Sequence, residues 1–351
     1  MDSVARLWKG SGNGKVECTA CARRCRIPEG SNGFCFVRQN HNGKLRLVNY
    51  GKLEAIQIDP IEKKPFNHFM PGSYVLGVGT SSCNWGCLFC QNHNISKERE
   101  INGRDVTPEE VVGLALENNA QCIAFTYNEP TIFIEYAIDV AGLAHMRGLY
   151  NLFVTNGYMT EEAVELMKGN IDAAVINLKG NGEQKFSNKY EVVMSNKPVK
   201  ESLVRLKDSG IHVEITDLII PGVGDSLKAC DELTGWIADN LGTDTPLQFT
   251  RFHPDYKMLD SSVTPYQTLE KHYDVAKRNG LDYVYIGNVP GNPHESTYCP
   301  SCNSEVIKRY GHYITGYGID SGGKCKNCSF RIPVFGRPPK VFRYESVKAL
   351  Y

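Results

Sequence analysis

The sequence lacks the features that would place the chain in a membrane, in the secretory pathway or on nucleic acid. Its longest apolar runs, such as residues 217–222, are far shorter than the roughly 20 apolar residues that a membrane-spanning helix needs. Residues 1–10 do not contain the apolar core of a signal peptide. Lys plus Arg and Asp plus Glu both total 39, so the net charge is zero and no basic nucleic-acid footprint is indicated. We therefore expect a cytoplasmic protein with neither a membrane nor a nucleic-acid partner.

Cysteine, by contrast, is abundant, with 13 in 351 residues. In a reducing compartment, clustered cysteines indicate metal binding rather than disulfides. Cys122 and Cys230 stand alone in apolar or helical surroundings, which is typical of small buried hydrophobic residues. The others form an N-terminal, a central and a C-terminal group: Cys18, Cys21, Cys25 and Cys35; Cys83, Cys87 and Cys90; and Cys299, Cys302, Cys325 and Cys328.

Between residues 74 and 290, short apolar runs alternate with helical stretches. Runs this apolar are typical of strands that are buried on both faces. Alternating strands and helices build a parallel sheet, and seven strands predict a partial, TIM-like (β/α) barrel of six to seven units. The predicted strands are residues 74–80, 122–127, 151–156, 173–178, 212–220, 247–252 and 283–288.

Residue types at the helix ends support this pattern. Thr107 with Glu110 has the spacing of a capping box, and residues 264–267 repeat it. Thr160 precedes two acidic residues and predicts another helix start. Helices are expected to end at glycines that accept a left-handed backbone, namely Gly148, Gly210 and Gly280.

The flanking segments differ in texture from this core. Residues 1–73 and 291–351 are rich in Cys, Gly and Pro, and predict small cysteine-rich metal-binding appendages at both ends of a core barrel over 74–290. The last 21 residues, 331–351, are expected to lie on the barrel surface as an arm. Residues 181–198 form a long connection, which is a candidate substrate-side lid.

In barrels of parallel strands, the chemistry takes place at the carboxyl ends of the strands. The polar residues that end the predicted strands are therefore the candidate site: Cys83, Asn128, Glu129, Thr155, Asn156, Asn177, Lys179, Thr216, Asp217, Arg251, His253 and Asn288.

The central cysteines directly follow the first predicted strand. Their spacing is Cys83-x3-Cys87-x2-Cys90. Thiolates are soft ligands that suit zinc or iron–sulfur clusters. Three of them can hold three irons of a [4Fe–4S] cluster and leave the fourth iron open to a ligand. A zinc site with His93 as a further ligand is the alternative.

The terminal groups each contain four cysteines. Cys299-x2-Cys302 and Cys325-x2-Cys328 are paired knuckles that predict a closed, structural zinc ribbon, with an iron–sulfur centre as the alternative. Cys18-x2-Cys21-x3-Cys25-x9-Cys35 predicts either zinc or an auxiliary iron–sulfur cluster that passes electrons or anchors a substrate. The short spacing with nearby glycines favours zinc.

Several segments together resemble the radical S-adenosylmethionine (SAM) superfamily. They include GTSSCNWGCLFCQN, FTYNEPTIF, FVTNGY, INLKG, ITDLIIPGVGDS, TRFHPDYKM and YVYIGN, together with the flanking cysteine groups, and they span nearly the whole chain. Within this superfamily the chain resembles the pyruvate formate-lyase-activating-enzyme-like branch, and most closely the radical SAM proteins of the AmmeMemoRadiSam system.

The resemblance implies a function and its cofactors. A [4Fe–4S] cluster on Cys83, Cys87 and Cys90 would cleave SAM reductively to a 5′-deoxyadenosyl radical that abstracts hydrogen from an unidentified substrate. An electron donor such as flavodoxin or ferredoxin is expected. A radical SAM enzyme that modifies a metabolite or macromolecule, by methylation or ring formation for example, is one alternative. A non-catalytic zinc-binding scaffold is the other.

The resemblance also implies roles for single residues. Asn128 and Glu129 stand where relatives bind the SAM amino group, and Thr155 with Asn156 where relatives contact SAM or substrate. Four further residues are expected on the SAM-binding rim: Asn177, Lys179, His253 and Asn288.

Each of these residues also has a simpler interpretation. Asn177-Leu-Lys179 replaces an Asp-Leu-Lys motif, so the charge of the Asp is missing. Asn156-Gly157 suits a plain turn, and His253 suits a strand-end hydrogen bond to a carbonyl. Residues 59–64 are expected to approach the cluster from outside the barrel, or to be a solvated charge run.

Overall fold

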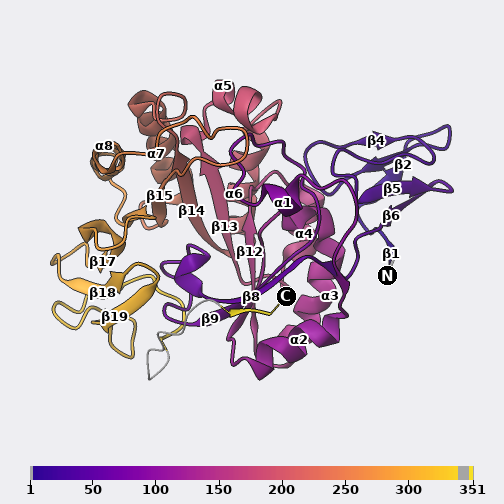
Figure 1. Ribbon diagram of the computed structural model, residues 1–351. Coiled ribbons are helices and arrows are strands. Elements are labelled where there is room, and N and C mark those ends of the chain that lie inside the picture. Colours follow the sequence, from indigo (N-terminus) through magenta and orange to yellow (C-terminus); the bar gives the residue numbers. More distant parts are fainter. Residues whose placement is uncertain (1–2, 339–347, 351) are drawn as a thin grey trace.

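A nine-stranded sheet forms the centre of the molecule (Figure 1). The computed structural model describes residues 3–338 and 348–350. Seven neighbouring strands are parallel, and each overlaps a predicted strand, so the predicted α/β class is confirmed. They are β9 (Tyr74–Gly79), β11 (Cys122–Phe125), β12 (Tyr150–Thr155), β13 (Ala173–Lys179), β14 (His212–Ile219), β15 (Leu247–Arg251) and β16 (Val284–Gly287).

Helices connect consecutive parallel strands, as such a topology requires. Shorter elements occupy the loops, among them α1 (His93–Ser96) and α5 (Gln184–Phe186). The connecting helices are α2 (Pro108–Glu117), α3 (Ile134–Met146), α4 (Glu161–Met167), α6 (Lys197–Asp208), α7 (Leu227–Leu241) and α8 (Tyr266–Arg278).

All three predicted helix starts are confirmed, and two of them have the predicted side-chain cap. Thr107 and Glu110 form a complete capping box on α2, and the Thr160 side chain caps α4. The predicted cap on α8 is wrong, because its N-cap residue is Pro265 and no side chain bonds there. Thr264 instead donates to the carbonyl of Ile219 at 2.6 Å, so its hydroxyl joins two loops rather than capping a helix.

The sheet is open, as expected for a partial barrel. Among the described residues it runs from β16 at one edge to β20 (Lys348–Ala349) at the other. β20 and β8 (Ala55–Pro60) are antiparallel additions next to β9. The approach of residues 59–64 to the cluster from outside the barrel stays a prediction, and Lys64 donates to the Tyr127 hydroxyl at 3.1 Å. The solvated charge run is wrong, because Asp59 and Lys64 are buried and paired at 2.7 Å. A strand in the N-terminal segment places them there, which the charge pattern did not indicate.

Successive strand residues point to opposite faces of the sheet, and each face has its own core. One face packs on the helices through residues such as Phe125 and Ile176. The other includes Val75 and Cys122, which pack against Phe66 and Phe69. Cys122 and Cys230 are fully buried hydrophobic residues, as predicted.

The two cysteine-rich appendages lie on opposite sides of the central sheet (Figure 1). The N-terminal one contains two small antiparallel sheets, and the C-terminal one contains a third. A short pair, β7 (Lys52–Leu53) and β10 (Arg104–Asp105), lies outside them. The appendage strands are β1 (Ser3–Val4), β5 (Arg38–His41) and β6 (Lys44–Leu47); β2 (Trp8–Gly10), β3 (Val16–Cys18) and β4 (Arg26–Ile27); and β17 (Thr297–Tyr298), β18 (Glu305–Tyr310) and β19 (Tyr313–Tyr317).

Single contacts tie these appendages and the tail to the sheet. Arg38 forms an ion pair with Glu135 of α3 at 2.5 Å, and both side chains are almost fully buried. Phe335 stacks on Phe69 with ring centroids 4.7 Å apart, so the start of the predicted arm lies on the barrel. Residues 339–347 and 351 of that arm lie outside the described residues. No helix in the described ranges is long and apolar enough to cross a membrane.

Candidate active site

The central cysteines lie on a loop, hereafter the cysteine loop (residues 80–92), that follows β9 at the carboxyl edge of the parallel strands. Asn128 fixes the start of this loop. Its Nδ2 donates to the Thr80 hydroxyl at 2.9 Å and to the Ser82 carbonyl at 2.8 Å. Ser82 has φ 71° and Tyr127 has φ 70°, a left-handed backbone that is uncommon outside glycine and concentrates at functional sites.

Other loops brace the cysteine loop. The amide of Gly86 donates to the Glu191 carbonyl and that of Leu88 to the Tyr190 carbonyl, each at 2.9 Å. A Cβ on Gly86 would lie 2.9 Å from Cβ of Val192, so no larger side chain fits without displacement. The segment 181–198, interpreted as a lid, is therefore packed on the cysteine loop and holds its backbone.

Sulfur spacing separates the three cysteine groups. In a tetrahedral zinc site with Zn–S of about 2.3 Å, ligand sulfurs lie about 3.8 Å apart. In the C-terminal group, Cys299 and Cys328 sulfurs are 3.5 Å apart, and those of Cys302 and Cys325 are 3.7 Å apart. Across the described residues, this is the only group of three or more ligand atoms within 4.8 Å of one another.

The central group therefore has no single-ion geometry. Its three sulfurs do not lie within 4.8 Å of one another, and the same holds for His93, so the zinc alternative finds no support among the described residues. His93 instead lies 3.2 Å from Asp255 and stacks on Tyr256. A [4Fe–4S] cluster binds each thiolate to a different iron and needs wider spacing, so the donor set fits that group.

Positive charge around the loop suits an anionic cluster. Burial by itself disfavours the thiolates, because it raises the pKa of Cys83 to about 11 and raises that of Cys87 as well. Lys97 donates to the Trp85 carbonyl at 3.0 Å, and Lys179 lies 5.1 Å from the Trp85 ring centroid. These two ammonium groups can offset the charge of thiolates.

Glu129 is fully buried and accepts four hydrogen bonds. One carboxylate oxygen accepts from the Thr131 amide at 3.0 Å, the Thr131 hydroxyl at 2.6 Å and the Thr155 hydroxyl at 2.6 Å. The other accepts only from the Asn156 amide at 2.8 Å, so one of its lone-pair sites is left for a further donor. The contact between Glu129 and SAM stays a prediction.

Asn156 continues this network to the cysteine loop. Its Nδ2 donates to Oδ1 of Asn84 at 2.8 Å, and that oxygen lies 3.7 Å from the sulfur of Cys83. The predicted residues Asn128, Glu129, Thr155 and Asn156 are therefore brought together behind the cysteine loop. Asn156 carries this connection in addition to forming a turn.

The remaining predicted residues occupy three separate places. Asn177 accepts from the Thr216 hydroxyl at 2.5 Å, and Lys179 donates to the Asn177 carbonyl at 2.6 Å, beside the cysteine loop. His253 is exposed, with Nδ1 3.0 Å from the Pro254 carbonyl, which is the simpler interpretation of this residue. Asn288 is exposed and lines a hollow next to β16 and β18, with Arg309 on its wall. Their SAM contacts stay predictions.

Sequence reasoning did not find four residues of the site. Asn84 and Trp85 lie inside the cysteine motif, so their position was a usable signal. Lys97 and Glu191 had none, because only the fold brings them to the loop. Glu191 is buried, and this burial raises its pKa to about 7.

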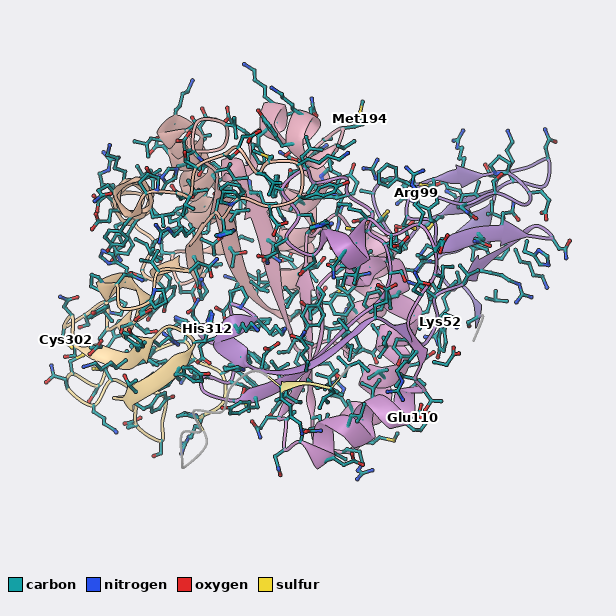
Figure 2. All side chains as sticks on the ribbon, viewed as in Figure 1. Lys52, Arg99, Glu110, Met194, Cys302 and His312 are labelled. Atoms are coloured by element: carbon teal, nitrogen blue, oxygen red, sulfur yellow. The ribbon has the colours of Figure 1, made fainter. Side chains whose placement is uncertain are left out.

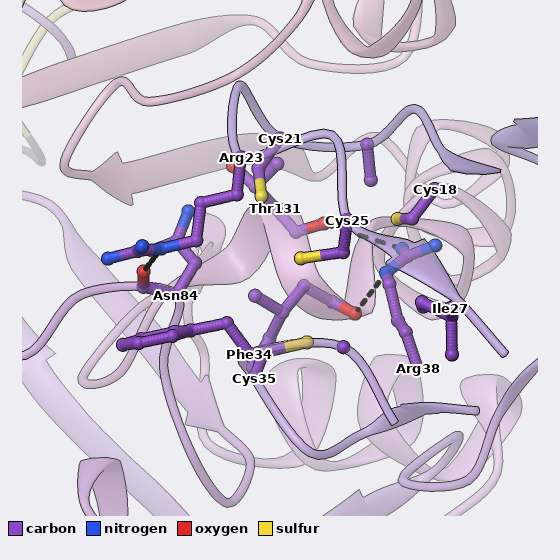
Figure 3. A pocket seen from close by; sticks show the side chains of 13 residues that line it. Cys18, Cys21, Arg23, Cys25, Ile27, Phe34, Cys35, Arg38, Asn84 and Thr131 are labelled. Carbon is purple, nitrogen blue, oxygen red and sulfur yellow. Dashed lines mark hydrogen bonds between the residues drawn. The ribbon is translucent and has the colours of Figure 1, made fainter. Parts of the chain in front are cut away.

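The N-terminal cysteines surround a pocket of their own (Figure 3). Arg23 lies over the Phe34 ring at 3.6 Å, and both residues line this pocket. Asn84 of the cysteine loop also lines it, so the N-terminal group adjoins that loop. In the C-terminal group, by contrast, Cys302 lies at the outer edge of its appendage (Figure 2).

The sequence matches the family described as Radical SAM superfamily over residues 78–236. The uncharacterized protein MJ0808 of Methanocaldococcus jannaschii is 41% identical over 333 residues, covering 94% of this chain and 98% of its own. The uncharacterized protein MJ0674 of the same organism is 22% identical and covers 76% of each chain. A solved radical SAM methyltransferase from Sphaerobacter thermophilus is 14% identical with a TM-score of 0.48, covering 64% of this chain and 70% of that one.

Proposed function

Because this chain belongs to the radical SAM superfamily, we propose that Cys83, Cys87 and Cys90 bind a [4Fe–4S] cluster and that the protein uses SAM to abstract hydrogen from a substrate. Family membership implies both the cluster and SAM. When bound, the reduced cluster would donate one electron to SAM, whose sulfur–carbon bond would break to give methionine and a 5′-deoxyadenosyl radical.

One observation carries this proposal. Three buried or half-buried cysteines follow β9 at the carboxyl edge of a parallel sheet, with sulfurs too far apart for a single ion. The matched family segment contains all three. A non-catalytic zinc scaffold would need the single-ion spacing, which within the described residues only the C-terminal group has.

The surrounding residues of this chain would position the cluster and its ligand. Asn128 holds the backbone that leads into Cys83, while Glu129 orients Asn156. Lys97 and Lys179 provide positive charge next to Trp85, which suits thiolates and the SAM carboxylate. The contacts that Glu191 and Tyr190 make through their carbonyls limit movement of the cysteine loop.

The test is SAM cleavage by anaerobically reconstituted protein. Wild type with a reductant should release 5′-deoxyadenosine, and Cys87→Ala should lower this at least about 100-fold with loss of iron. Cys230→Ala, which removes a fully buried thiol outside every cysteine group, is the matched control and should keep both. Cleavage that persists in Cys87→Ala would refute the assignment.

The reaction type is proposed to follow the activating-enzyme-like resemblance. The hydrogen donor would then be a backbone glycine of a protein or a carbon of a small molecule. Deuterium transfer from a labelled candidate into 5′-deoxyadenosine identifies the donor. A methylated or cyclised product would instead favour the modification-enzyme alternative.

We also propose that a zinc ion occupies the C-terminal group. Its two sulfur distances, 3.5 and 3.7 Å, match a tetrahedral site with no free position. Cys299 and Cys325 belong to a small core with Tyr283 and Tyr285, so the ion would be structural.

A further inference from the structure

The four N-terminal cysteines surround one pocket. All four are free thiols and line one pocket, and three of them are buried (Figure 3). No three of their sulfurs lie within 4.8 Å of one another, unlike the C-terminal group. This spacing is too wide for one zinc ion and suits a cluster whose irons are bound separately.

Four protein thiolates saturate such a cluster. No iron is then open to a substrate or to SAM, in contrast to the three-cysteine loop. A saturated cluster can carry electrons without binding a ligand, so the anchoring role weighed from the sequence is disfavoured here.

The pocket also holds polar groups that suit an anionic cluster. Arg38 is 2% exposed and lines the pocket, with Glu135 as its partner. Asn84 is fully buried and lines the same pocket, and its Nδ2 has no hydrogen-bond partner among the described residues. Amide donors to cluster sulfurs are a recognised means of tuning reduction potential.

Asn84 connects this pocket to the cysteine loop. Its Oδ1 lies 3.7 Å from the Cys83 sulfur, while the residue itself forms part of the pocket wall. Arg23, from between Cys21 and Cys25, donates to the Asn84 carbonyl at 2.5 Å. Asn84 therefore lies between the N-terminal cysteines and Cys83, and it offers a short path for an electron between the two groups.

The pocket reaches the surface beside Asn84, where Arg23 lies over the Phe34 ring at 3.6 Å. Phe34 is 40% exposed, and Cys25 is half-buried. A donor protein can approach there without passing through the barrel, where the substrate is expected.

We propose that Cys18, Cys21, Cys25 and Cys35 bind a second iron–sulfur cluster that relays electrons to the cluster on Cys83, Cys87 and Cys90. This relay rests on the proposed function. An external one-electron donor protein is oxidised, the second cluster is reduced by one electron, and it is reoxidised as that electron passes to the first cluster. No bond is formed or broken in this step.

Metal content gives the first test. Iron, sulfide and zinc are measured after anaerobic reconstitution of wild type, Cys21→Ser/Cys25→Ser and Cys87→Ala. Wild type should hold about eight irons and each variant about four. Loss of one zinc with unchanged iron in Cys21→Ser/Cys25→Ser, or no metal loss, would overturn the proposal. If this double variant does not fold, Cys87→Ala should still show a reducible iron–sulfur signal by electron paramagnetic resonance, and its absence overturns the proposal.

The relay is tested by comparing two reductants. The ratio of SAM cleavage with reduced flavodoxin to cleavage with dithionite should fall at least about tenfold in Cys21→Ser/Cys25→Ser. An unchanged ratio would overturn the relay. Failure of wild type to cleave SAM with either reductant would count against the proposed function, while the iron count would still decide whether the second cluster exists.

Discussion

The N-terminal and C-terminal cysteine groups have the same number of ligands but different geometry and surroundings. The C-terminal sulfurs converge to 3.5 and 3.7 Å in pairs, and Cys302 lies at the outer edge of its appendage. The N-terminal sulfurs are spread around a pocket whose wall includes Asn84 of the cysteine loop. Ligand count alone therefore does not distinguish the two groups, whereas sulfur spacing and neighbouring residues do.

The largest expected effect concerns the C-terminal group. Cys299→Ser/Cys302→Ser should remove one zinc and the binding free energy of a structural site, about 10–16 kcal/mol in isolated zinc domains. Strands β17–β19 should become sensitive to protease, because Cys299 and Cys325 belong to their core. Iron content and SAM cleavage should remain. If this variant lost iron instead of zinc, the C-terminal group would bind a cluster, and the two terminal groups would not differ in the metal that they bind.

Arg38→Ala should destabilise the N-terminal site next most strongly. It leaves Glu135 buried without its partner at 2.5 Å, which typically costs about 3–5 kcal/mol. Denaturant unfolding measures the loss. Arg6→Ala is the control, since its pair with Asp139 is partly exposed and should contribute less than about 1 kcal/mol. Equal losses of unfolding free energy in both variants would show that the ion pair of Arg38 with Glu135 is not the main contact between the N-terminal appendage and α3.

Glu129→Gln tests the link behind the cysteine loop. The amide removes one acceptor from a site that receives four hydrogen bonds, with an expected cost of about 3 kcal/mol. Iron retention at Cys83 should fall because Asn156 loses its orientation. Weakened SAM binding with normal iron and normal stability would assign Glu129 to the ligand instead. Thr131→Val removes one of these donors and keeps the carboxylate. It therefore distinguishes a role of Glu129 in orienting Asn156 from a role in binding SAM.

Gly86→Ala should have the smallest effect. Its Cβ would meet Val192 at 2.9 Å, so the cysteine loop and residues 181–198 must separate, at about 1–3 kcal/mol. Iron binding at the loop should weaken while the two terminal groups keep their metals. Gly113→Ala in α2, with no atom within 4 Å of the added Cβ, should be neutral or stabilising. Unchanged iron in Gly86→Ala would show that residues 181–198 do not hold the loop.

The local sequence pattern was sufficient to predict the strands of the parallel sheet and the cysteine motif, because both depend on residues that are close together in the chain. The predictions failed for residues that contact partners distant in the sequence. Thr264 has the spacing of a cap but bonds Ile219, and residues 59–64 look solvated but are buried through β8. Lys97 and Glu191 reach the loop only through chain folding.

The sequence alone determined the class of the fold and the three cysteine groups, since periodicity and motif spacing are local properties, and its segments also carried the resemblance to the superfamily. Tertiary structure alone decided which sulfurs converge and which remain apart. It also decided that Asn84 stands between Cys83 and the N-terminal pocket. The reason is physical: distances between ligands depend on how separate segments pack, and no spacing along the chain specifies them.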